Sequence, residues 1–432
     1  INTYTASTQA NPSVTSLSDG SFFVTWSSFA QAPDSSESGV FGQRFSAEGT
    51  MIGQETLINT YTSGTQHGSD VTRLADGSLV ATWSSNNQPG DASGYGIFAQ
   101  RFDAAYETPL ASNASVVVNG KTLTVDLSSH HNGSVNDHYG AATVIASAVN
   151  NDSDLQAAGY HATVATVDQV NAGTHAAGDV IITRAHIPDE TVTTATASTT
   201  TTAGAALIMT PTKLGPEFQV NTYTNSSQNE PVLTKLSNGG FVASWNSYGQ
   251  DGSNYAVQAQ MYDRWGNTVG SEFQVNTHTA SDQSAPSITS LNDGGFVVIY
   301  HSNGSSADSD SYGVYGQRYD ASGSTVGSEF LLNTFKSGYQ LYPSVTSLSD
   351  GGFVATWHSQ NQDGGGGGSY AFGVYGQRYD ASGNAVGGEF QVNTYTPGDQ
   401  MFSSATALSG GGFVVAYQSL DLSRMSYGIS AQ

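Results

Sequence analysis

The sequence predicts an all-β fold, a six-bladed β-propeller of four-stranded blades with a β-rich domain inserted in blade 2. Three observations support it: a tetrad centred on Asn-Thr occurs six times, β-rich runs separated by turn residues fill the intervals, and one interval is about 105 residues too long. The tetrads begin at Ile1, Ile58, Val220, Val275, Leu332 and Val392. A meander that repeats about every 55–60 residues is typical of a propeller blade.

The unit from 343 to 392 shows the elements of one blade in order. We expect strands at 343–348, 352–357, 373–379 and 389–392. Asp350-Gly351 predicts a two-residue type I′ turn between the first two strands. Arg378 and Glu389 lie symmetrically about the next turn, so we expect them to pair across the second hairpin.

The second strand carries no charge on either face, so both faces must be covered by neighbouring blades. A large aromatic residue stands near its end in every repeat, and we expect this series to pack between blades. The series is Trp26, Trp83, Trp245, Tyr300, Trp357 and Tyr417.

The long interval predicts the domain organisation. After Phe102-Asp103 the repeat resumes only at Gly215, so we expect a small β-sandwich or barrel at 105–213, inserted between the third and fourth strands of blade 2. The propeller then comprises 1–104 and 214–432. Because the chain opens on a tetrad and stops in a third strand, we expect the segment from Ile1 to Thr5 to close blade 6.

The charge balance bears on partners. Twelve Lys and Arg residues stand against 35 Asp and Glu residues, a net charge of -23, which repels phosphate backbones and anionic lipid. We therefore expect no nucleic-acid partner, and no apolar run predicts membrane insertion. The chain has no cysteine, which excludes disulfides and thiolate chemistry. Its polar, weakly charged composition suits an extracellular protein.

Two residue groups are candidate metal ligands. Loop acids among Gly, Ser and Asn offer the hard oxygen ligands that calcium prefers, with solvated loop acids as the alternative. They are Asp251, Asp308, Asp310 and Asp363. A histidine-rich stretch in the insertion could bind zinc or copper, with a plain polar loop as the alternative. It contains His130, His131, Asp137 and His138.

Catalytic motifs are missing from the sequence. It contains no Gly-x-Ser-x-Gly, no His-Glu-x-x-His and no phosphate-binding loop, and its carboxylates are repeated or scattered in loops. We therefore assign no catalytic residue and no ligand-binding residue, and expect a binding protein rather than an enzyme.

The repeat unit, 343–357 followed by 373–383, resembles the repeats of large bacterial secreted and surface proteins of the calcium-binding, type I secreted (RTX-like) class. This resemblance implies export, calcium-rich surroundings and adhesive or matrix roles. We expect an extracellular binding or adhesion module that contacts glycans or another surface protein through its propeller loops. The alternatives are a self-associating subunit of a surface layer or filament, and a carbohydrate-active enzyme, either a polysaccharide lyase or a glycosidase.

Overall fold

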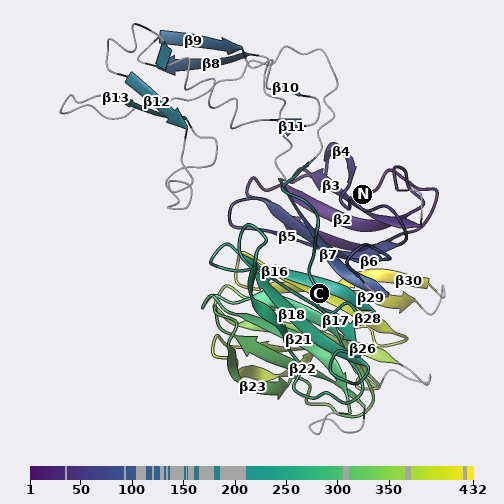
Figure 1. The fold of residues 1–432 in the computed structure, drawn as a ribbon. Helices are drawn as coiled ribbons and strands as arrows, with labels where there is room; N and C mark the ends of the chain where they lie inside the picture. Colours follow the sequence, from purple (N-terminus) through teal and green to yellow (C-terminus); the bar gives the residue numbers. More distant parts are fainter. Residues whose placement is uncertain are drawn as a thin grey trace. The chain divides into compact units, whose positions relative to one another are not determined.

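The fold is seen in a computed structural model of the chain (Figure 1). The structure describes residues 1–34, 37–91, 94–103, 211–304, 311–364, 371–421 and 426–432. Between 104 and 210 it describes only 113–118, 121–126, 131–132, 135–136, 150–151, 153, 160–164 and 180–184. Contacts divide the chain into two units, Ile1–Ala104 with Lys213–Gln432, and Ala105–Thr212.

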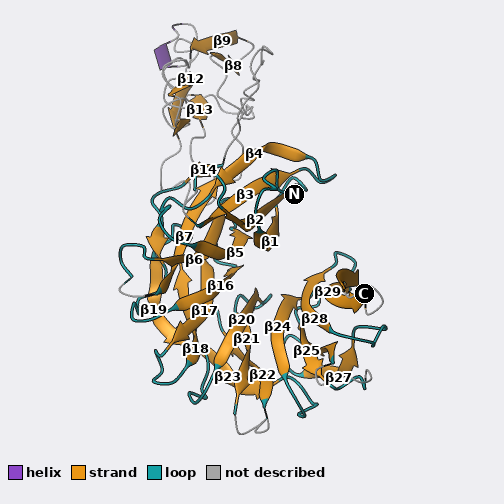
Figure 2. Cartoon of the chain, turned by 90° about the vertical axis from the view of Figure 1, so that its right-hand side faces the viewer, coloured by secondary structure: helices purple, strands orange, loops and turns teal. Residues whose placement is uncertain are grey.

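The first unit contains six antiparallel sheets, here called blades 1 to 6 in chain order (Figure 2). Blade 1 contains β1 (Gln9–Ser16), β2 (Phe22–Phe29), β3 (Ser38–Phe45) and β4 (Met51–Leu57). Blade 2 contains β5 (Gln66–Arg73), β6 (Leu79–Asn86) and β7 (Tyr95–Asp103), with β14 (Thr212–Lys213) and β15 (Phe218–Gln219) both paired to β7. Blade 3 contains β16 (Gln228–Lys235), β17 (Phe241–Tyr248), β18 (Tyr255–Tyr262) and β19 (Thr268–Gln274).

The last three blades continue the same meander. Blade 4 contains β20 (Gln283–Ser290), β21 (Phe296–Asn303), β22 (Tyr312–Tyr319) and β23 (Thr325–Leu331). Blade 5 contains β24 (Gln340–Ser347), β25 (Phe353–Gln360), β26 (Phe372–Tyr379) and β27 (Ala385–Gln391). Blade 6 contains β28 (Gln400–Ala407), β29 (Phe413–Asp421) and β30 (Ser426–Ala431).

Neighbouring blades pack through their first strands. β1 contacts β5, and the contacts continue from β5 to β16, β20, β24 and β28. The first strands are therefore innermost, and the later strands of each blade lie further out (Figure 2). The predicted six-bladed, all-β propeller of four-stranded antiparallel blades is confirmed.

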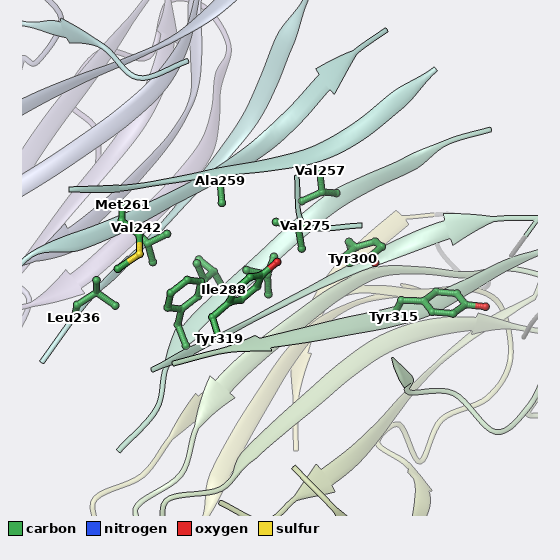
Figure 3. Close-up of a cluster of buried hydrophobic side chains, with 12 residues drawn as sticks. Leu236, Val242, Val257, Ala259, Met261, Val275, Ile288, Tyr300, Tyr315 and Tyr319 are labelled. Atoms are coloured by element: carbon green, nitrogen blue, oxygen red, sulfur yellow. The ribbon is translucent and has the colours of Figure 1, made fainter. Parts of the chain in front are cut away.

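The core lies between the blades, as the uncharged second strands require. Between blades 3 and 4, Val242 and Met261 pack with Ile288, Tyr300 and their neighbours in a continuous buried cluster (Figure 3). All six aromatic residues predicted to pack between blades are buried, and Trp83, Trp245, Tyr300 and Trp357 are wholly inaccessible. Burial of such a side chain stabilises the fold by roughly 1.5–3 kcal/mol.

Two predictions about hairpins are wrong. In the first hairpin of blade 5, Gly351 has a φ of 90° whereas Asp350 lies outside the left-handed region, so the loop is a type I turn followed by a glycine bulge. Arg378 Nη2 pairs with Asp350 Oδ2 at 3.0 Å, not with Glu389. The reason is the register of the hairpin: the turn pairs Tyr379 with Ala385 and Arg378 with Val386, so Glu389 lies further along β27 and is not opposite Arg378.

The tetrads form joints between blades. At the joint between blades 5 and 6, Asn393 Oδ1 accepts a hydrogen bond from the Val374 amide of β26 at 2.7 Å, while Asn393 Nδ2 donates to Gln400 Oε1 of β28 at 3.1 Å. The same two kinds of bond are made by Asn59, Asn221, Asn276 and Asn333. One asparagine thereby joins the third strand of a blade to the first strand of the next.

The first tetrad makes only part of this pattern among the described residues. Asn2 Nδ2 donates to Gln9 Oε1 at 3.1 Å, and the Thr3 amide donates to Glu55 of blade 1. Ile1 is 69% exposed, and Ile429 of β30, the counterpart of Val374, is 77% exposed. Residues 1–5 form no strand, so closure of blade 6 by the segment from Ile1 to Thr5 stays a prediction.

The second unit contains three described strand pairs. They are β8 (Asn113–Val118) with β9 (Lys121–Asp126), β10 (His131–Asn132) with β11 (Val135–Asn136), and β12 (Tyr160–Val164) with β13 (Val180–Arg184). The chain leaves blade 2 after β7 and rejoins it at β14. An inserted sandwich or barrel at 105–213 stays a prediction. No helix among the described residues has the length and apolar character to cross a lipid bilayer.

Candidate functional site

Every first strand contains a β-bulge at the same repeat position. The register between the first and second strands slips there in all six blades. The bulge residue has a φ between 49° and 66°, in the left-handed region that side chains other than glycine adopt at a cost. These residues are Asn11, Gly68, Glu230, Ala285, Tyr342 and Phe402. Such strain, repeated around the molecule, indicates a functional site.

The six bulges surround one cavity of about 630 Å³. Its lining comes from the innermost strands of all six blades, so it lies in the central channel of the propeller. A volume of this size is typical of small-molecule sites, which measure roughly 300–1,000 Å³. We call this cavity the channel site.

The repeat is constant around the bulge and variable at it. Two positions before the bulge residue all six repeats have glutamine, and four positions after it all six have threonine. The bulge residue itself is an amide, a glycine, a carboxylate, a methyl group, a phenol or a phenyl ring. The backbone is thus kept while the side chain that borders the channel site changes in every blade.

One part of the wall is acidic. Asp70 of β5 accepts hydrogen bonds from the Ser13 hydroxyl at 2.5 Å and from the Leu233 amide at 2.7 Å, which ties β1, β5 and β16 together. Glu230 of β16 accepts a hydrogen bond from Asn246 Nδ2 at 2.8 Å. Desolvation raises the pKa of both carboxyl groups above the usual range.

Another part of the wall is aromatic. Tyr342 and Phe402 are 41% and 48% exposed, and their ring centroids lie 5.1 Å apart at an interplanar angle of 63°. His358 stacks against Tyr342 at 5.4 Å, and His301 packs edgewise on it at 5.5 Å. Burial, followed by the negative charge of Glu230, raises the pKa of the Tyr342 hydroxyl, so the two parts of the wall influence one another.

Neutral imidazoles hold the aromatic part in place. His301 Nδ1 accepts a hydrogen bond from the Tyr342 amide at 3.3 Å, and His358 Nδ1 accepts one from the Phe402 amide at 3.4 Å. Burial lowers the pKa of His301 to about 4 and that of His358 to about 3, so both are uncharged at pH 7. Each histidine belongs to the blade before the bulge that it supports.

Other blades make this support with other residues. Ser27 Oγ accepts a hydrogen bond from the Gly68 amide at 3.0 Å, and Asn246 Oδ1 accepts one from the Ala285 amide at 3.1 Å. The support therefore acts on the bulge backbone and places no demand on the bulge side chain.

The residues predicted to bind metal lie elsewhere. Asp251 lies in the loop between β17 and β18 and Asp363 in the loop between β25 and β26, and the Ser253 amide donates to Asp251 Oδ1 at 3.0 Å. Asp308, Asp310, His130, Asp137 and His138 lie outside the described residues, as does the side chain of His131. Among the residues described, no three His, Cys, Asp or Glu side chains gather as a metal site. Both metal assignments stay predictions.

Sequence reasoning missed the channel site. The available signal was the one position in the first strand that differs in every repeat while its neighbours recur. The sequence predicts binding in the propeller loops, whereas the variation that borders the cavity lies within strands.

The similarity of this chain to known proteins is a similarity of fold. No protein-family model matches the chain, and no curated protein matches it. Among solved structures, an α-L-arabinofuranosidase from Fusarium graminearum is similar with a TM-score of 0.51 and 10% identity, over 98% of this chain and 92% of that one. An α-L-arabinanase from Penicillium chrysogenum has a TM-score of 0.48 and 12% identity, over 98% and 93%. The NanB sialidase from Streptococcus pneumoniae has a TM-score of 0.45 and 11% identity, over 98% and 67%.

Proposed function

We propose that this chain is an extracellular carbohydrate-binding propeller that takes a saccharide in its channel site. The observation that carries the proposal is the placement of two exposed aromatic rings, Tyr342 and Phe402, on the same cavity as Asp70 and Glu230. Aromatic faces pack against the C–H faces of sugar rings, while carboxylates accept hydrogen bonds from sugar hydroxyls. The low content of charged residues, 11%, suits an extracellular location.

The experiment is isothermal titration calorimetry with ligands first selected on a glycan array. Tyr342→Ala and Phe402→Ala each remove one ring, and we expect each to weaken binding about tenfold. Trp265→Ala is the matched control, because Trp265 is 55% exposed but lies on the turn between β18 and β19. Equal affinity of all four proteins would contradict the proposal, as would a loss confined to Trp265→Ala.

A glycoside hydrolase is the second candidate, favoured by two carboxylates with raised pKa values on one cavity. Glycosidases use such pairs, one carboxyl group as acid and the other as nucleophile or base. Because an arabinofuranosidase has a similar fold, arabinofuranosides should be among the substrates tested. Release of reducing sugar that Glu230→Gln abolishes, with binding retained, would replace the binding function by this one.

Calcium and export belong to the proposal through the repeat's resemblance to RTX-like surface proteins. Asp251 and Asp363 are the described loop acids that would take part. Thermal melts with calcium and with a chelator test this, and a midpoint unchanged by either would remove calcium from the proposal. Contact with a surface protein, or self-association, would appear as complexes of higher mass under native conditions.

A further inference from the structure

We infer that the channel site selects a saccharide that carries a protonated amine. This deepens the proposed function and rests on it. The first observation is the charge of the wall: among the described residues that line the cavity, the side chains that can carry a full charge at neutral pH are Asp70 and Glu230, both acidic. With a net charge of -23 on the whole chain, the cavity repels sialic acids, uronates and sulfated sugars.

The two charges are not neutralised within the part of the chain that the structure describes. Elsewhere in the propeller, acids that follow the first strand pair with an arginine, as Asp76 does with Arg101 and Asp350 with Arg378. Asp70 and Glu230 are instead held by a hydroxyl, by backbone amides and by the Asn246 amide. A desolvated carboxylate without a counter-ion is unfavourable, and a bound cation relieves that cost.

The charge of Asp70 exceeds what its structural role needs. Asp70 Oδ2 accepts the Leu233 amide of the next blade. At the equivalent position, the neutral Ser287 accepts the Val345 amide at 3.1 Å, and Ser344 accepts the Ala405 amide at 3.2 Å. Since serine makes this inter-blade bond in other blades, the bond itself does not require a carboxylate.

The bulge at Glu230 likewise does not require a charged side chain. The other bulge residues are uncharged, and the backbone conformation is the same with any of them. Asn246 Nδ2 donates to Glu230 Oε2, which leaves Oε1 for a ligand. An ammonium group has three donors, so it can bond to Glu230 Oε1 and still donate to other oxygen atoms of the wall.

The rest of the wall suits an organic ammonium better than a metal ion. Calcium takes six to eight oxygen ligands. The channel site instead offers the rings of Tyr342 and Phe402 and the prolines of four blades, Pro12, Pro231, Pro286 and Pro343. Aromatic faces attract ammonium groups by cation–π interaction and pack on the sugar ring that carries the amine.

The test is calorimetric titration of the full chain with a glucosamine hexamer and with its N-acetylated counterpart, at a pH below the pKa of the amine. We expect the amine-bearing hexamer to bind at least about tenfold more tightly, because acetylation removes the charge. Asp70→Ser and Glu230→Gln should each remove most of that preference. Asp70→Ser introduces the residue that stands at the equivalent positions 287 and 344, where it makes the same inter-blade hydrogen bond, so the fold is kept.

Non-specific attraction to an acidic protein is controlled by Glu48→Gln, which changes the net charge equally in an exposed turn. We expect this variant to bind as the wild type does. If both hexamers bind equally and Phe402→Ala abolishes both, the proposed function stands and this inference fails. If calcium chloride alone binds in a manner that Asp70→Ser removes, the selected cation is a metal and the inference also fails. If no saccharide binds, the proposed function itself fails.

Discussion

The joints between blades and the channel site are built from the same repeat, yet they constrain sequence in opposite ways. At five joints an asparagine makes the same two hydrogen bonds, to the third strand of one blade and to the first strand of the next. At the channel site, six bulges share a backbone conformation and no two share a side chain.

The difference follows from whether side-chain or backbone atoms make the hydrogen bonds between blades. A joint uses the side chain, because only an amide both accepts from one strand and donates to another at this spacing. A bulge uses the backbone, whose amide is bonded by a residue of the preceding blade at Gly68, Ala285, Tyr342 and Phe402. The bulge side chain is thus free of structural duty, which allows six identical frames to present six different groups to one ligand.

The largest expected effect is on the core that both regions share. Trp357→Ala removes a wholly buried side chain between blades and should lower the free energy of unfolding by about 3–5 kcal/mol. Chemical denaturation measures this. Trp265→Ala, at an exposed position, should change it by less than about 0.5 kcal/mol. Similar losses for the two variants would show that the core does not lie between the blades.

Acid should destabilise the aromatic part of the channel site. Burial lowers the pKa of His358 to about 3, so the stability that its neutral form provides is present above pH 6.5 and is lost as the pH falls toward 3. His358→Asn should remove this loss, roughly 2–4 kcal/mol, because Asn246 of blade 3 already supports the Ala285 bulge amide of blade 4. Denaturation curves from pH 3 to pH 8 report it, and parallel curves for both proteins would contradict it.

Replacing a joint asparagine by alanine should lower the free energy of unfolding, and the loss should be larger where the asparagine makes more hydrogen bonds. Asn393→Ala leaves the buried Val374 amide without its acceptor and should cost about 1–3 kcal/mol. The contacts described for Asn2 are fewer, so Asn2→Ala should cost less. An equal loss would establish that Asn2 also accepts the Ile429 amide, as closure of blade 6 requires.

The smallest expected effect is a gain. Desolvation raises the pKa of Asp70 in the folded protein, so its ionised form opposes folding once the pH rises through that pKa. Asp70→Ser should therefore raise the melting temperature at pH 7, and the gain should disappear at acid pH where Asp70 is protonated. A lower melting temperature at pH 7 would show that the carboxylate is needed for the inter-blade hydrogen bond with the Leu233 amide.

Periodicity in the sequence was enough to predict the blades and the buried aromatic series. It failed where turn geometry or a bulge sets the register. The turn after β26 pairs Arg378 with Val386 and not with Glu389, and the bulges of the first strands brought Glu230, Tyr342 and Phe402 to the channel site. No local signal marks a left-handed glutamate or tyrosine within a strand, because these residues rarely adopt that conformation; at Tyr342 a hydrogen bond to His301 of the preceding blade holds it.

The most direct test of the channel site is a crystal structure of the chain with a bound glucosamine oligomer. Our account predicts a sugar ring packed on Tyr342 and Phe402, with its amine beside Glu230 and Asp70 and the bulge backbones unmoved. An oligomer bound on the outer loops or on the inserted unit, with the channel site free of sugar, would contradict it.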